Sequence, residues 1–372
     1  MGIIIGADLV PTASNKQQFI NGDVEELFDD KILKTLKSAQ MRIFNLETVL
    51  SSSETTIAKI GPNFKTNPEV VRGFKQLDID IFTLANNHIM DYGAAGLKDT
   101  IDILEKNDIA YVGIGHDIST VNHSYIFEVC EKKVGIYACA EHEFSIATEN
   151  TPGANPYDPL ESFEHIADLK NRCDYVIVLY HGGKEYYRYP SPLLQKVCRK
   201  MCTSGADLVV CQHSHCIGCE EKYNDSTIIY GQGNFLFDIS DDEFFTSSLL
   251  IDIEIESDIP KVNYIPIVKN KNGIRKANES ESQKIMSMFY ERSVKIQDAD
   301  FIKKEYEKFA SRMLDGYIDG VFGTNIFFRI LNKLSGHRLT RHINNKKALF
   351  LRNYIECEAH SEIFLVALKN LK

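Results

Sequence analysis

Five polar clusters follow apolar runs of the sequence, and their side chains are of the types that bind divalent transition metals. They are Asp8, Asn45-Leu46-Glu47, Asn86-Asn87-His88, His181 and His213-Ser214-His215. Carboxylate and amide oxygens together with imidazole nitrogens are the ligands that a pair of such ions requires. A bridging carboxylate keeps two ions about 3.5–4 Å apart, close enough to hold a phosphoryl or acyl group. The sequence therefore predicts a metal site.

Each cluster also has a plainer explanation when it is taken alone. Asp8 and the Asn86-Asn87 pair suit turns, because short polar side chains hydrogen-bond to nearby backbone. His181 precedes two glycines and could occupy a tight bend. The joint occurrence of all five clusters, each at the end of an apolar run, favours metal binding over these explanations.

The histidine pair His213 and His215 allows two metal hypotheses. Both imidazoles can reach one site only if the backbone leaves extended geometry after Cys211, where we expect a loop. The same segment continues into Cys216 and Cys219, and such a Cys-x-x-Cys pair beside histidines resembles half of a structural zinc site. The sequence has no second cysteine pair at the required spacing, so we favour ligation by the histidines.

Alternating strand and helix patterns must position the clusters. Strand-like runs cover residues 3–5, 41–47, 79–85, 110–114, 134–138, 173–180, 206–211, 226–230 and 248–256, and helical spacing covers residues 97–106 and 191–203. This alternation predicts an α/β layered domain. Since α/β folds place their sites at the carboxyl ends of strands, the clusters are expected to converge. Residues 55–64 read as a surface loop beside the second strand.

After Val268 the pattern becomes mostly helical, over residues 280–292, 299–314 and 339–369. No chemical motif occurs there. We expect residues 1–268 to form the catalytic domain and residues 269–372 a helical region that packs on it or mediates self-association.

The composition of the 372-residue chain is that of a globular protein, with 44% apolar residues. The net charge of −10 argues against binding of nucleic acid through a broad basic surface. It does not exclude an anionic substrate, because a metal cluster can reverse the local charge.

Nine scattered cysteines, among them Cys139 and Cys211 within apolar runs, fit buried thiols in a reducing compartment, and we expect Cys198 and Cys202 to face a core. The first residues lack the basic flank and the length of a signal peptide. No run approaches the roughly 20 apolar residues of a membrane helix. A cytoplasmic location is expected.

Five segments resemble motifs of the CapA (poly-γ-glutamate capsule synthesis, PGA_cap) family. Residues 84–93, Leu-Ala-Asn-Asn-His-Ile-Met-Asp-Tyr-Gly, are similar to its most distinctive signature, and the others are residues 45–48, 181–186, 212–218 and 230–238. They span about residues 3–240 in the family's order. The resemblance implies the four-layer α/β/β/α sandwich of calcineurin-like metallophosphoesterases.

The resemblance also implies roles for individual residues. Two divalent ions, Mn, Fe or Zn, would be held by Asp8 and His215 on one side and by Asn87, His181 and His213 on the other, with Glu47 as the bridge. His88 would be the general acid that protonates the leaving oxygen. Further candidates for substrate binding are Asn45, Asn86, His142, Lys184, Glu185 and Arg188.

The sequence departs from these patterns at four positions, one of which is Glu47, a longer side chain than the usual bridging aspartate. Val10 stands where the wider superfamily has the histidine of Asp-x-His, so one ligand of the first metal is absent. Gly182 and Ser214 replace the usual tryptophan and proline. An additional cluster, Glu141-His142-Glu143, is either a charged loop or part of the pocket lining.

These observations predict a metal-dependent hydrolase that cleaves a phosphoester of an anionic small molecule or polymer, linked to capsule or cell-surface polymer synthesis. Hydrolysis of a γ-glutamyl amide is an alternative, since the same chemistry suits an acyl carbon. A non-catalytic accessory protein of polymer synthesis is another. No nucleic acid and no membrane segment is expected, and the C-terminal helices could form a homo-oligomer.

Overall fold

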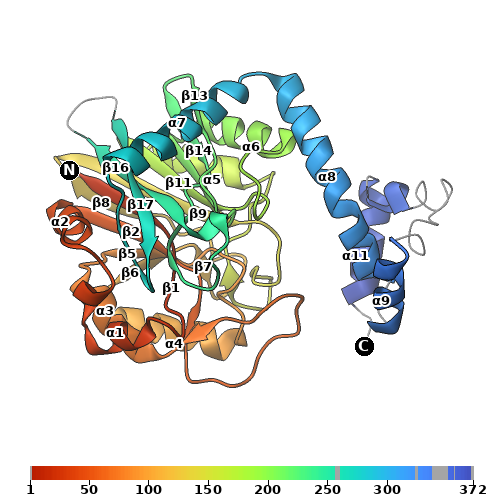
Figure 1. Ribbon diagram of the computed structural model, residues 1–372, viewed down its shortest axis with the longest axis horizontal. Coiled ribbons are helices and arrows are strands. Elements are labelled where there is room, and N and C mark those ends of the chain that lie inside the picture. Colours follow the sequence, from red (N-terminus) through yellow and green to blue (C-terminus); the bar gives the residue numbers. More distant parts are fainter. Residues whose placement is uncertain (1, 256–259, 323–325, 337–350, 356, 370–372) are drawn as a thin grey trace. The chain divides into compact units, whose positions relative to one another are not determined.

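The computed structural model describes residues 2–255, 260–322, 326–336, 351–355 and 357–369. The chain divides into two compact units, Met1–Ile302 and Lys303–Lys372. The first unit contains two large β-sheets with helices (Figure 1). The described residues of the second unit are mostly helical.

The larger sheet runs in the order β18-β17-β16-β1-β2-β5-β6, and β15 also pairs with β1. Its parallel strands are β1 (Ile3–Val10), β2 (Met41–Leu46), β5 (Ile81–Thr83), β6 (Ala110–Val112) and β15 (Asn234–Phe237). Its antiparallel strands are β16 (Ser247–Glu254), β17 (Lys261–Asn270) and β18 (Gly273–Lys276).

The other large sheet runs in the order β13-β14-β12-β11-β9-β8. Its strands are β8 (Tyr125–Val129), β9 (Lys132–Ala140), β11 (Tyr175–His181), β12 (Leu208–Gln212), β13 (Glu220–Tyr223) and β14 (Ser226–Tyr230). Strands β9, β11, β12 and β14 are parallel. Two short pairs complete the strands, β3 (Val49–Leu50) with β4 (Lys65–Thr66) and β7 (Ile114–Gly115) with β10 (Gly153–Ala154).

Helices pack around the two sheets of the first unit, and the last of them contacts strands of both sheets, β13 and β17. They are α1 (Lys16–Asn21), α2 (Asp30–Ser38), α3 (Val71–Gln76), α4 (Gly93–Lys106), α5 (Ser162–Lys170), α6 (Pro192–Thr203) and α7 (Glu279–Lys295). Helix α6 begins where expected, because the Ser191 side chain accepts a hydrogen bond from the Leu194 N–H and Pro192 follows it.

Alternating residues of β11 show how the layers pack. Ile177 and Leu179 belong to one apolar cluster with Ile3 and Ile5 of β1, so this face of the strand packs toward the larger sheet. Val176 and Val178 belong to a second cluster with residues of α5 and α6. On the far side of the larger sheet, Phe82 packs against Phe74 of α3 with ring centroids 5.0 Å apart. This arrangement is the predicted four-layer α/β/β/α sandwich.

The first unit extends beyond the expected boundary at residue 268. Strand β17 pairs with β16 so that Val268 lies opposite Ser247, and β18 continues the same sheet. Helix α7 then packs Phe289 against Tyr264 of β17, with ring centroids 4.9 Å apart. Strand β17 runs across residue 268 and α7 packs on it, so the compact unit extends past the expected boundary to Ile302.

The C-terminal helices are α8 (Ala299–Phe322), α9 (Ile326–Leu334) and α11 (Glu358–Lys369), which confirms the predicted helical region. Residues 337–350, part of the helical stretch expected over 339–369, lie outside the described residues. In the part of the chain that the structure describes, no helix combines the length and apolar character of a membrane span.

Replacement of Phe235 tests the core beneath the site. Phe235 is 1% exposed and its ring lies 5.4 Å from that of Phe28 and 4.6 Å from that of Phe44. We expect Phe235→Ala to lower the free energy of unfolding by about 3–5 kcal/mol, because it leaves a cavity. Urea denaturation measures the change. The control Phe144→Ala, at a position 51% exposed, should stay within about 0.5 kcal/mol of the unmodified protein.

Candidate metal centre

The carboxyl ends of parallel strands from both sheets bring the predicted ligands together. Glu47 follows β2, and His181 is the last residue of β11. Asp8 lies within β1, which continues to Val10 instead of ending at Asp8 as expected. The pairing of β1 with its neighbours shifts register on either side of Asp8. This irregularity lets the strand continue while Asp8 serves the site.

Two groups of ligand atoms share the Glu47 carboxylate. One group consists of Asp8, Glu47 and His215, and the other of Glu47, His181 and His213. Within each group the candidate ligand atoms all lie within 4.8 Å of one another, and every residue is buried. Glu47 is thus the residue that the two groups have in common, and Asn87 belongs to neither of them.

Several polar atoms of these groups are buried without a hydrogen-bond partner. They are both carboxylate oxygens of Glu47, Oδ2 of Asp8 and Nδ1 of His213. A buried carboxylate without compensation is costly, by several kcal/mol as an order of magnitude. A divalent cation would compensate it, and carboxylates with imidazoles are ligands that transition metals accept. The residues therefore fit one or two divalent ions.

The electrostatics of the cluster agree with this fit. Burial, followed by the charge of Asp8, raises the pKa of Glu47 well above its usual value. Burial lowers the pKa of His181 to about 4 and that of His213 well below its ordinary range, so both imidazoles are in the neutral, metal-binding form. Burial opposes protonation of His215 too, but the carboxylates of Glu47 and Asp8 outweigh it and raise its pKa to about 9.

The backbone after β12 confirms the expected departure from extended geometry. His213 has φ of 82° and His215 has φ of 54°. Such left-handed conformations cost a non-glycine residue about 1–3 kcal/mol and persist only when the surroundings impose them. Here they place both imidazoles toward one site, with ring centroids 6.1 Å apart.

Asn87 lies beside the second group, as predicted. Its Oδ1 is 3.0 Å from Nε2 of His181, and its Nδ2 donates to Glu143 at 3.0 Å. Glu143 thereby fixes which end of the amide faces the cluster. In the additional Glu141-His142-Glu143 cluster, His142 is exposed to solvent, whereas Glu141 accepts from the Gly183 N–H at 3.1 Å.

The side chains of Asn45 and Asn86 form hydrogen bonds behind the candidate ligands. Asn45 donates to Oδ1 of Asp8 at 2.8 Å and lies 3.4 Å from Nδ1 of His181. Asn86 donates to Oδ1 of Asn45 at 3.1 Å and to the Leu46 carbonyl at 2.9 Å. Both are fully buried, so their amides orient other residues of the site.

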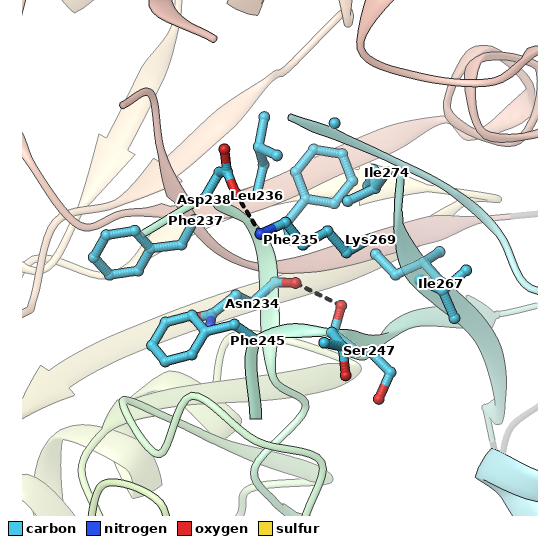
Figure 2. Close-up of a pocket in the computed structure, with 14 residues that line it drawn as sticks. Asn234, Phe235, Leu236, Phe237, Asp238, Phe245, Ser247, Ile267, Lys269 and Ile274 are labelled. Atoms are coloured by element: carbon cyan, nitrogen blue, oxygen red, sulfur yellow. Dashed lines mark hydrogen bonds and ion pairs between the residues drawn. The ribbon is translucent and has the colours of Figure 1, made fainter. Parts of the chain in front are cut away.

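Asn234 is a contact that the sequence analysis did not assign, although it lies within the recognised segment 230–238. Its Oδ1 lies 2.9 Å from Nδ1 of His215. Figure 2 shows the strand that carries it, β15, which ends at Phe237; the next residue, Asp238, pairs with Lys269 at 2.6 Å. The pocket drawn there contains none of the predicted site residues among its lining. We infer that this segment positions His215 through the contact with Asn234.

The predicted general acid His88 is buried and held by Asp91. Its Nδ1 lies 2.7 Å from Oδ2 of Asp91. Burial lowers the pKa of His88, although Asp91 opposes the shift. Asp91 was not assigned from the sequence, yet it lies three residues on in the same recognised segment.

The remaining candidates occupy varied positions. Lys184 and Glu185 are partly buried in the turn after β11, and the charge of Glu185 contributes to the raised pKa of Glu47. Arg188 donates to the Ile217 carbonyl at 3.0 Å and lies over the Phe244 ring, so its guanidinium is already engaged.

Most of the cysteines are buried as expected, but Cys130 is exposed and Cys357 is half-buried. All nine are free thiols, and Cys139, Cys198, Cys202 and Cys211 are buried in the core. Cys216 and Cys219 are also buried, and burial raises the pKa of Cys216 to about 11. Among the described residues, the groups that could hold a metal contain no cysteine, which counts against the structural zinc hypothesis.

A family model described as "Bacterial capsule synthesis protein PGA_cap" matches residues 3–239. The chain is 34% identical over 180 residues to the PGA biosynthesis protein CapA of Bacillus subtilis, covering 47% of each chain. It is 34% identical over 176 residues to the capsule biosynthesis protein CapA of Bacillus anthracis, covering 46% of this chain and 43% of that one. The matches thus span about half the length of these relatives.

Among solved structures, the chain is similar to a putative 5′-nucleotidase from Staphylococcus aureus in complex with alpha-ketoglutarate. The TM-score is 0.43 at 14% sequence identity, over 78% of this chain and 58% of that one.

Replacement of Glu47 by the isosteric glutamine tests the cation fit. Without added ions, we expect Glu47→Gln to raise the midpoint of thermal unfolding near neutral pH, because a carboxyl whose pKa is raised on folding costs stability above its unfolded-state pKa and glutamine does not. The unmodified protein should gain stability from Zn²⁺ or Mn²⁺, about 2.7 kcal/mol at about 100 times the dissociation constant. The variant should lose most of that gain. Unfolding scans with chelator and with added ion measure both effects.

A matched control is Asp252→Asn in β16. Asp252 is 5% exposed and its Oδ1 also lacks a hydrogen-bond partner, but it belongs to neither ligand group. This variant should keep the full gain from the added ion. An equal gain in Glu47→Gln would contradict the assignment of Glu47 as a shared ligand.

Proposed function

Because the chain belongs to the PGA_cap family of bacterial capsule synthesis proteins, we propose that it is a metal-dependent hydrolase that cleaves a phosphoester of an anionic substrate. The observation that carries the proposal is the buried carboxylate of Glu47, whose two oxygens lack hydrogen bonds and which both ligand groups share. Such a carboxylate supports a pair of divalent ions, of which Mn, Fe and Zn suit the ligands.

Ions bound there would supply Lewis-acid polarisation of a phosphoryl oxygen and activation of a water molecule. The residues that would hold them are Asp8, Glu47, Asn87, His181, His213 and His215. His88 would give a proton to the leaving oxygen. Because Nδ1 of His88 faces Asp91, Nε2 is the nitrogen that would deliver the proton.

The family and the names of its relatives support a substrate from capsule or cell-surface polymer synthesis. Hydrolysis of a γ-glutamyl amide is the second candidate, favoured by similarity to the Bacillus subtilis protein named for PGA biosynthesis. We also propose a cytoplasmic location and self-association through the C-terminal helices.

The test compares hydrolysis of p-nitrophenyl phosphate, bis-p-nitrophenyl phosphate and γ-glutamyl-p-nitroanilide by the protein loaded with Mn²⁺ or Zn²⁺. We expect turnover of a phosphoester. His88→Gln should lower kcat by about 10²–10⁴-fold, the usual contribution of a general acid, on a phosphoester whose leaving alcohol, unlike p-nitrophenol, must be protonated to depart, with unchanged metal content. The control His116→Gln, at an exposed position outside both ligand groups, should retain activity.

Turnover of the anilide alone would replace the proposal with amide hydrolysis. Absence of turnover on all three substrates, by protein shown to contain metal, would favour a non-catalytic accessory role. Full activity of His88→Gln would remove His88 from the proposed chemistry.

A further inference from the structure

The segment of residues 57–64, in the loop between β3 and β4, is hydrogen-bonded to Asp91, the partner of His88. The Ile57 N–H donates to the Asp91 carbonyl at 3.0 Å, and Nδ2 of Asn63 donates to the same carbonyl at 2.9 Å. The Phe64 N–H donates to Oδ2 of Asp91 at 2.6 Å. Residues 55–64 thus form the expected loop, with none of them fully buried, and within it Ile57, Asn63 and Phe64 attach the segment to Asp91.

Lys59 carries a buried positive charge within this segment. Its side chain is 3% exposed and forms an ion pair with Asp91, which is fully buried. Its Nζ also lies 3.2 Å from Nδ1 of His88. The next residue, Ile60, is 88% exposed, so the chain turns outward immediately afterwards. Desolvation of an ammonium group is costly unless the group is paired. The ion pair with Asp91 therefore stabilises the buried position of the Lys59 side chain.

The ammonium group of Lys59 is not needed to attach the segment. Backbone and amide hydrogen bonds from Ile57, Asn63 and Phe64 already fix it to Asp91. The Phe64 ring adds a contact with the His88 ring, at 4.4 Å between centroids. What the Lys59 ammonium group adds is a positive charge next to the His88 imidazole and the Asp91 carboxylate.

We propose that Lys59 is a positioning residue for His88. Its ammonium group pairs with one oxygen of Asp91, while the other oxygen faces Nδ1 of His88, so the carboxylate is fixed from both sides. The imidazole is then held between this carboxylate and the Phe64 ring in one orientation. The inference rests on the proposed function in one respect only, namely that His88 delivers a proton to the leaving oxygen.

The first test uses the full chain loaded with Zn²⁺ and the substrate on which it is most active. Lys59→Met keeps the length of the side chain and removes its charge. We expect kcat to fall by about 10–100-fold, as for a misaligned reacting group, with KM within about twofold and metal content unchanged. Lys59→Arg, which retains the charge, should recover part of the loss. A loss in KM alone would overturn the proposal.

Lys65→Met is the matched control. Lys65 lies in β4 directly after the segment, and its ion pair is with Glu54, whose side chain is 88% exposed. Its contact with Tyr92 is a cation–π interaction at 4.8 Å. We expect kcat of this variant to stay within about twofold of the unmodified protein, because exposed pairs contribute little. An equal loss in both variants would show a general effect of loop charge and overturn the proposal.

A second measurement does not depend on turnover. NMR spectra of the Zn²⁺-loaded protein, labelled at histidine Cε1 and assigned for His88 with His88→Gln, report the state of that imidazole. At fixed pH, Lys59→Met should shift or broaden the His88 signal and Lys65→Met should not. An unchanged His88 signal in Lys59→Met would overturn the proposal even if no substrate is turned over, so its failure is distinguishable from failure of the proposed hydrolase.

Discussion

The buried carboxylate of Glu47 is the constraint on which the site depends. It lies beside the carboxylate of Asp8, is fully buried, and has no hydrogen-bond partner among the described residues. Two like charges in such a place are unfavourable unless positive charge is supplied. Without a bound ion, protonated His215 supplies part of it, since its pKa is raised to about 9 against the effect of burial, whereas a bound cation would replace that proton and leave His215 free to ligate. The neutral state favoured for His181 and His213 leaves the remainder to a cation.

The scaffold meets this constraint by joining two sheets at the carboxyl ends of their parallel strands. The first sheet contributes the acidic ligands through β1 and β2, and the second contributes the imidazoles through β11 and β12. The backbone departs from regular geometry at two places that position ligands. These are the shifted register of β1 at Asp8 and the left-handed conformations of His213 and His215. The asparagines behind the ligands then satisfy the polar groups that face away from the cluster.

Much of this arrangement could be predicted from the sequence, because polar residues at the ends of apolar runs reveal where parallel strands deliver their side chains. Glu47 and His181 are of this kind. Lys59 could not be predicted, since one lysine in a polar loop resembles any solvated charge until the fold brings it to Asp91. The boundary at residue 268 was wrong for a different reason. Strand β17 runs through residue 268 to Asn270 and turns directly into β18, so two antiparallel hairpins extend the sheet past the point where the helical pattern was expected to begin.

The measurement that tests the central claim most directly is the metal content per chain of freshly purified protein, by plasma mass spectrometry. The account predicts close to two equivalents of Mn, Fe or Zn, although Val10 provides no ligand to the first group. It also predicts a reduced content when His213 is replaced by alanine. Protein that is folded but holds no metal, even after reconstitution with each ion, would contradict the account.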